Sequence, residues 1–152
     1  MNVRAVLDTN VVVAGLSSKR GASHALLRLG YAGRFAMLAS PALWLEYEAV
    51  LKRPQIAHMH GLAPQGVDDF LDALAMRVEP VCIRYLWRPQ LNDPQDEMVL
   101  EAAMNGRADR LVTFNGADFA KAMIALPIRL QTPAEFLAFL ENRDDPSFPE
   151  HP

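Results

Sequence analysis

The chain has 152 residues, of which 51% are hydrophobic and 22% are charged, and its formal net charge at pH 7 is −3. This length and composition predict one globular domain that can bury a sizeable core. A small net negative charge gives no global basic field that would indicate a nucleic-acid partner, although a near-neutral surface can still carry a local basic rim.

Three further features indicate a cytoplasmic protein without a membrane span. No apolar run reaches the roughly 18 to 20 residues that a span needs, and the N-terminus lacks the basic region and cleavage site of a signal peptide. The single cysteine, Cys82, cannot form an internal disulfide. Because it lies in the strand-like stretch VEPVCI, we expect it to be a buried core thiol.

Strand-like and helix-like segments alternate along the chain. The strand-like segments are VRAVLD (3–8), RFAMLA (34–39), VEPVCIR (78–84), RLVTF (110–114) and IRLQT (128–132). The helix-like segments lie at 22–30, 41–52, 64–76, 94–105, 118–124 and 133–141. Pro41, Pro94 and Pro133 each stand where a helix would begin, a position that tolerates the missing N–H. The alternation predicts an α/β fold with a parallel sheet and helices on both faces.

The folded domain is predicted to cover residues 1–141. The last stretch, NRDDPSFPEHP (142–152), is acidic and rich in proline. Such a composition buries too little apolar surface to offset the entropy of ordering, so we expect a disordered tail.

Asp8 ends the first strand-like segment and interrupts an apolar run that resumes at Val11. In parallel α/β sheets, ligands bind beyond the carboxyl ends of the strands, which is where Asp8 would lie. A helix cap explains the residue equally well, because aspartate caps helices and Thr9 and Asn10 could begin a turn. The choice depends on whether other carboxylates reach the same edge.

Glu46 lies on the helix predicted after the second strand, at the border of its apolar face. That face is formed by Leu43, Tyr47, Val50 and Leu51. Glu48 is turned well away from it. Taken alone, Glu46 is explained more simply as a solvated residue that interacts with the helix dipole.

Further acidic and amide groups follow in the second half of the chain. Asp93 and Asp96 stand at the N-cap and the third position of the helix that begins at Pro94, a pattern that capping alone explains. Three polar residues come just after the fourth strand, namely Thr113, Asn115 and Asp118. Asp118 is again explained as a cap or a turn residue.

The joint placement of these groups nevertheless favours one shared site. Carboxylates that converge in a crevice repel one another unless protons or cations offset their charge. Hard oxygen ligands of this kind suit Mg²⁺ or Mn²⁺ rather than zinc. His58-Met59-His60 lies on a predicted loop and is interpreted as incidental, and the nucleotide-binding glycine motifs are absent from the sequence.

Four motifs, in order and at fitting separations, resemble those of the PIN-domain family, and most closely its VapC-like branch of toxins. They are LDTNV, SPALWLEY, DPQDEMVLEAA and LVTFNGADF. The resemblance covers about residues 1–140. It implies a three-layer α/β/α fold with a five-stranded parallel sheet of order 3-2-1-4-5, in which strands 1 and 4 are neighbours.

The resemblance also implies a set of metal ligands. The acidic cluster of the family maps onto Asp8, Glu46 and Asp96, with Asp93 as the additional acid of this branch. A fourth position, often aspartate in the family, is Asn115 here, which removes a ligand for a second metal unless Asp118 takes its role. The residues expected to orient these ligands are Asn10, Thr113 and Asn115.

The activity implied is Mg²⁺- or Mn²⁺-dependent hydrolysis of single-stranded RNA by the toxin of a type II toxin–antitoxin pair. The metal would polarise the phosphate and activate water, which Asp96 or Asp118 could orient. The cations that could hold RNA phosphates are Lys19, Arg20, Lys52 and Arg53. The implied protein partners are a small antitoxin and a second copy of the chain, as a homodimer.

Two other functions fit parts of the pattern. A haloacid-dehalogenase-like phosphatase also places an aspartate after its first strand, but it needs a D-x-D pair, and Asn10 stands at the second position. A degenerate PIN domain would bind RNA or protein without cutting. Asn115 favours that alternative, whereas the retained acids, Asp8, Glu46, Asp93 and Asp96, argue against it.

Overall fold

A parallel sheet forms the centre of the protein, which is described here by a computed structural model over residues 2–86 and 91–144. Within those residues the strands are β1 (Arg4–Leu7), β2 (Ala36–Ala39), β3 (Glu79–Pro80), β4 (Arg110–Val112) and β5 (Arg129–Gln131). All neighbouring pairs are parallel, and the order is β3-β2-β1-β4-β5. Both the predicted α/β class and the predicted strand order are confirmed.

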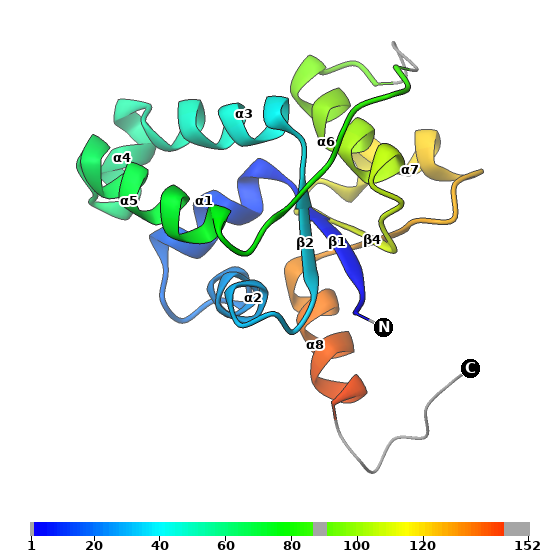
Figure 1. The fold of residues 1–152 in the computed structure, drawn as a ribbon, viewed down its shortest axis with the longest axis horizontal. Helices are drawn as coiled ribbons and strands as arrows, with labels where there is room; N and C mark the ends of the chain where they lie inside the picture. Colours follow the sequence, from blue (N-terminus) through cyan, green and yellow to red (C-terminus); the bar gives the residue numbers. More distant parts are fainter. Residues whose placement is uncertain (1, 87–90, 145–152) are drawn as a thin grey trace.

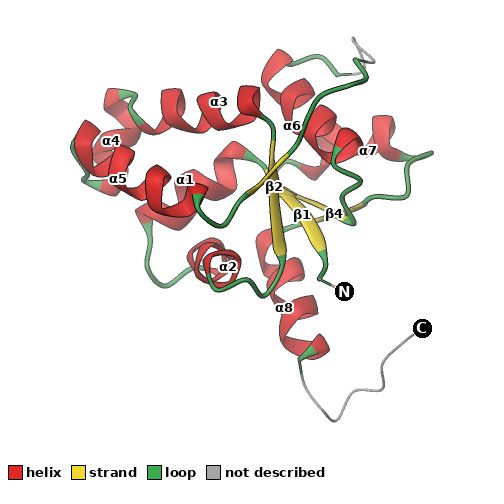
Figure 2. Cartoon of the chain, in the orientation of Figure 1, coloured by secondary structure: helices red, strands yellow, loops and turns green. Residues whose placement is uncertain are grey.

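Helices cover both faces of this sheet. They are α1 (Thr9–Ser17), α2 (Ala22–Tyr31), α3 (Pro41–Leu51), α4 (Pro54–His60), α5 (Pro64–Ala75), α6 (Pro94–Asn105), α7 (Gly116–Met123) and α8 (Pro133–Arg143). Helices α6 and α7 lie on one side of the strands and α2 and α8 on the other (Figure 1). Helices α1, α3, α4 and α5 pack together beside the sheet (Figure 2).

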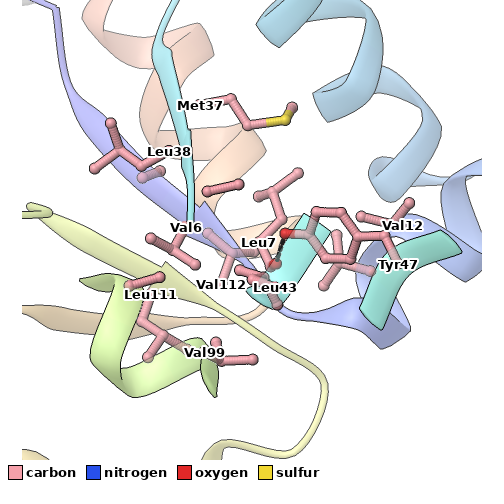
Figure 3. Close-up of a cluster of buried hydrophobic side chains, with 14 of the residues drawn as sticks. Val6, Leu7, Val12, Met37, Leu38, Leu43, Tyr47, Val99, Leu111 and Val112 are labelled. Atoms are coloured by element: carbon pink, nitrogen blue, oxygen red, sulfur yellow. Dashed lines mark hydrogen bonds between the residues drawn. The ribbon is translucent and has the colours of Figure 1, made fainter. Parts of the chain in front are cut away.

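The central strands are buried on both faces, which explains their continuous apolar sequences. Ala5, Val6 and Leu7 of β1 are wholly inaccessible to solvent, and Val6 and Leu7 lie among side chains from β2, β4, α3 and α6 (Figure 3). The hydroxyl of the buried Tyr47 donates a hydrogen bond to the carbonyl oxygen of Leu7. Helix α3 is thereby joined to the carboxyl end of β1, directly before Asp8.

Two helices differ from the sequence-based expectation. Helix α1 begins directly after Asp8 and contains the β-branched run Val11–Val13, whose side chains are buried. His58 and His60, which were expected on a loop, lie in α4, so that prediction was wrong. The ring of His60 lies 2.8 Å from the carbonyl oxygen of Leu51 and accepts a hydrogen bond from the backbone of Leu62 at 3.0 Å.

The prediction that Cys82 is a buried core thiol was also wrong, because its side chain is exposed. Strand β3 covers only Glu79–Pro80 of the predicted strand 78–84. It is the edge strand of the sheet, and Pro80 lacks the N–H that a longer ladder would use. The chain pairs once more, through the amide of Val81, and then leaves the sheet before Cys82.

Helix α8 continues to Arg143, two residues beyond the predicted domain end, and residues 145–152 of the predicted tail lie outside the described part of the chain. Among residues 2–86 and 91–144, no helix combines the length and apolar character needed to cross a membrane.

We expect Tyr47→Phe to lower the free energy of unfolding by about 1–2 kcal/mol, because a buried carbonyl of β1 loses its donor. Urea unfolding followed by circular dichroism measures the change. The matched control is Tyr31→Phe, since Tyr31 is 48% exposed and its hydroxyl removal should alter stability by less than about 0.5 kcal/mol. Equal effects of the two substitutions would show that the Tyr47 hydrogen bond does not stabilise the fold.

Candidate active site

Asp8 lies at the carboxyl end of β1, and only 5% of it is exposed. One carboxylate oxygen, Oδ1, accepts a hydrogen bond from the backbone N–H of Thr9 at 2.7 Å, so Asp8 is the N-cap of α1. The other, Oδ2, accepts from the hydroxyl of Thr113 at 2.6 Å. That hydroxyl in turn accepts from the backbone N–H of Asn115 at 3.0 Å. The cap therefore also fixes the carboxylate between β1 and the end of β4.

Two more carboxylates stand at the N-terminus of α6. Asp93 is the N-cap, as predicted, and its Oδ1 accepts a hydrogen bond from the backbone of Gln95 at 2.9 Å. Asp96 follows in the first turn of the helix. The positive end of the helix dipole favours negative charge at both positions.

The beginning of α7 supplies the remaining groups. Asp118 lies in the first turn of this helix and is exposed. Asn115 occupies the N-cap position, and within the described residues its side chain makes no capping hydrogen bond. Its amide is therefore available to the cavity that it lines.

These residues surround two adjoining cavities that share Asp93 and Asp96 in their walls. The first, which we call the acidic cavity, has a volume of about 610 Å³ and is also lined by Asp118 and Lys121. The second, which we call the mixed cavity, has a volume of about 440 Å³. Polar members of its wall include Asp8, Asn10, Arg53 and Asn115, and a prominent apolar member is Phe114.

The carboxylates around the cavities influence one another. Removal from solvent, followed by the charges of Asp8, Asp93 and Asp118, raises the pKa of Asp96 to about 6. Burial also raises the pKa of Asp8, with smaller contributions from Asp93 and Asp118, and the hydrogen bonds from Thr113 and Thr9 act in the opposite direction. The proximity of these carboxylates is therefore electrostatically unfavourable, and protons or cations would offset their repulsion.

The comparison with protein families settles the family to which this arrangement belongs. The family model described as PIN domain matches residues 4–117. The chain belongs to the PIN-domain family. No curated protein matches the sequence. PIN domains are typically nucleases, so the acidic edge of this PIN domain is its candidate active site. Asp118 and Lys121 lie just outside the matched residues.

Glu46 differs from the other acids of this PIN domain in its position. It is half-buried in the middle of α3 and is not among the described residues that line either cavity. Its Oε1 atom and the Oδ1 atom of Asn10 are buried, and neither has a hydrogen-bond partner within the described part of the chain. Buried acceptors are nearly always paired, with an ordered water or ion where protein donors are lacking.

The oxygen ligands available in this PIN domain suit a hydrated divalent cation. Across residues 2–86 and 91–144, no cluster of three or more acidic, histidine or cysteine side chains is compact enough to hold a metal. Mg²⁺ retains several waters and commonly uses only one or two protein carboxylates. Oxygen donors, carboxylates with raised pKa values and the unpartnered Oε1 of Glu46 fit that mode of binding.

The four cations expected at the rim are placed differently from one another. Arg53 lines the mixed cavity beside Asp8. Lys52 is paired instead with Glu48 at 2.9 Å and Asp68 at 2.7 Å. Lys19 and Arg20 follow the far end of α1, about 13 Å along the helix from its first residue.

Phe114 and Lys121 are among the residues of the cavity walls that sequence reasoning missed. Phe114 stands between Thr113 and Asn115, so its neighbours were informative even though a phenylalanine usually indicates core. Lys121 is three residues after Asp118, which places both on one face of α7.

The raised pKa of Asp96 predicts how stability depends on pH in the absence of metal. Between about pH 4 and pH 6 the folded state binds more protons than the unfolded state, so the free energy of unfolding falls as pH rises through that window. Asp96→Asn removes this titration, and the variant should gain stability over wild type as pH increases.

Urea unfolding in EDTA at a series of pH values between about 4 and 7 measures the difference between the two proteins. The control is Asp72→Asn, which removes a carboxylate at an exposed position of α5 that is not among the described residues lining either cavity. A difference between Asp96→Asn and wild type that is constant over the whole range would contradict the assignment.

Proposed function

We propose that this protein is a Mg²⁺- or Mn²⁺-dependent endoribonuclease that hydrolyses phosphodiester bonds of single-stranded RNA. The observation that carries the proposal is the gathering of Asp8, Asp93, Asp96 and Asp118 around two adjoining cavities of a PIN domain. The mutual effect of these carboxylates on the pKa of Asp96 supports a site that is completed by a cation.

In this proposal the metal ligands come from Asp8, Glu46, Asp93, Asp96 and Asp118. The metal would supply a Lewis acid that polarises the phosphate and a bound water of lowered pKa. Asp118 lines the same cavity as Asp96, and either carboxylate is suited to orient the attacking water. The water oxygen bonds to phosphorus and gives up a proton to that carboxylate, the bond to the leaving oxygen breaks, and the leaving oxygen takes up a proton from solvent.

The neighbouring polar groups keep the acids in position. Thr113 fixes the orientation of Asp8 through its hydroxyl, and the backbone of Asn115 fixes that hydroxyl. The unpartnered oxygens of Glu46 and Asn10 supply further acceptors for a cation or for its bound waters. Asn115 adds a neutral amide to the wall of the mixed cavity.

We further propose that the protein acts in the cytoplasm as a homodimeric toxin of a type II pair, held inactive by a small antitoxin. This part rests on the motif resemblance of LDTNV, SPALWLEY, DPQDEMVLEAA and LVTFNGADF. A short adjacent reading frame that encodes a DNA-binding protein would support it. Growth arrest on expression of the chain alone, relieved by co-expression of that neighbour, is the direct test.

We expect the purified protein to cleave single-stranded RNA when Mg²⁺ or Mn²⁺ is present and to lose this activity on chelation. Gel analysis of labelled oligoribonucleotides with and without EDTA measures it. Asp8→Asn should lower the cleavage rate by at least about a hundredfold, whereas Asp72→Asn should leave it unchanged. Undiminished cleavage in excess chelator would exclude the mechanism. Metal binding without cleavage of any RNA would instead favour a degenerate PIN domain that binds without cutting. The presence of Asn115 in place of an aspartate is consistent with that alternative.

Asp8→Asn should also separate a metal ligand from a simple helix cap. Asparagine caps nearly as well as aspartate, so the metal-free variant should be at least as stable as wild type, because one repelling charge is gone. Metal at about 100 times its Kd should stabilise wild type by about 2.7 kcal/mol. Thermal melts with and without Mg²⁺ should show a much smaller shift for the variant. A shift equal to that of wild type would mean that Asp8 does not bind the metal.

A further inference from the structure

Phe114 is unusual among the aromatic residues of this protein, because it is 51% exposed and lines a cavity that contains carboxylates. It is the second residue after β4 and stands between Asn115 and Thr113, whose hydroxyl donates to Asp8. A phenylalanine has no polar atom that benefits from contact with water. Its ring therefore presents an apolar face beside the acidic groups at the point where the substrate backbone would pass.

The rest of the wall of the mixed cavity also combines apolar and charged side chains. Val13, Ile56 and Met59 provide apolar surface, and Met59 is 57% exposed. Arg53 adds a guanidinium group to the same wall. The acidic cavity has a comparable charge, with Asp93, Asp96, Asp118 and Lys121 in its wall, but no aromatic side chain is among the described residues that line it. The two cavities therefore offer different surroundings on the two sides of Asp96.

A ligand that fits the mixed cavity should combine a flat apolar ring with a nearby anion. An unpaired nucleotide has this combination, because its base has a free π-face and its phosphate carries the negative charge. In a duplex both faces of a base are already covered by neighbouring base pairs, so the ring of Phe114 could not stack on it. Aromatic stacking tolerates every base, whereas the guanidinium of Arg53 would contact the phosphate.

We propose that the mixed cavity binds the unpaired base adjacent to the scissile phosphate, with Phe114 as its stacking surface and Arg53 as the phosphate contact. This inference deepens the proposed nuclease function and rests on it. It assigns the preference for single strands to a specific side chain. Phe114 is a substrate-binding residue, and Asp8 and its neighbouring acids carry out the hydrolysis.

The test is a scan in which each base of one single-stranded oligoribonucleotide is replaced in turn by an abasic site. Cleavage by wild type, measured as kcat/KM with Mg²⁺, should fall about tenfold or more when the abasic site is next to the cleaved bond. For Phe114→Ala the same replacement should have an effect of less than about twofold, because the stacking partner is already missing. Phe114→Trp should restore the dependence on the base.

Leu45→Ala is the matched control, since Leu45 is 64% exposed on α3 and is not among the described residues that line either cavity. It should keep the wild-type abasic profile. Thermal melts of all variants verify that they are folded. An abasic penalty that is the same in wild type and in Phe114→Ala would overturn the stacking assignment while leaving the nuclease function intact.

Binding of the same oligoribonucleotides to Asp8→Asn, followed by fluorescence anisotropy, gives a readout that does not depend on cleavage. The Phe114→Ala substitution in this background should remove the affinity difference between the intact and abasic strands. If that difference is removed although wild type cleaves no RNA, the base site stands and the nuclease proposal fails. If it persists, the base site is wrong.

Discussion

Two hydrogen bonds fix the carboxylate of Asp8 at the end of β1, and the arrangement of the whole acidic edge depends on them. A buried carboxylate needs donors. The first comes from Thr9, because the N–H groups at the start of a helix have no partner within that helix. The second comes from Thr113, which reaches Asp8 because β4 is the direct neighbour of β1. The strand order and the immediate start of α1 together provide both donors.

The N-termini of helices also explain how several carboxylates coexist at this edge. Asp8 and Asp93 are N-caps, and Asp96 and Asp118 lie in first turns, so the four stand at the N-termini of α1, α6 and α7. The partial positive charge of each helix end offsets part of their repulsion. Burial, together with the repulsion that remains, raises the pKa of both Asp8 and Asp96. Capping by these residues therefore does not exclude the functional role that we propose for them.

The sequence predicts features that depend on neighbouring residues better than features that depend on residues far apart in the chain. Helix starts at Pro41, Pro94 and Pro133 are local, because each depends on a missing N–H, and all three were found. The strand order came from motif resemblance and was correct. The exposure of Cys82 depends on where an edge strand ends, and Pro80 alone was a weak indication. Three successive valines favour a strand locally, so the sequence did not predict helix α1. Burial of the three side chains in the core outweighs this local preference.

The placement of the site residues shows the same limit. Asp93 and Asp96 could be placed from adjacent sequence, since both are defined by the helix that starts at Pro94. Whether Glu46 reaches the cavities depends on the side-chain direction of α3, which the apolar face restricts only to a border position. In the part of the chain that the structure describes, its Oε1 is buried without a hydrogen-bond partner, and Glu46 is not among the residues that line either cavity. Sequence patterns report which face a residue occupies, and they do not report the distance across a cavity.

Asn115 gains a physical meaning in the context of the mixed cavity. An aspartate at this position would add a carboxylate to a wall that already holds Asp8, Asp93 and Asp96, and it would raise their pKa values further. The amide keeps hydrogen-bonding capacity without that charge. It also leaves the environment of Phe114 less negative, which reduces the repulsion of a phosphate group bound next to the ring. A neutral residue at Asn115 thus keeps a fourth carboxylate out of the mixed cavity, whose apolar wall in our proposal stacks on an unpaired base.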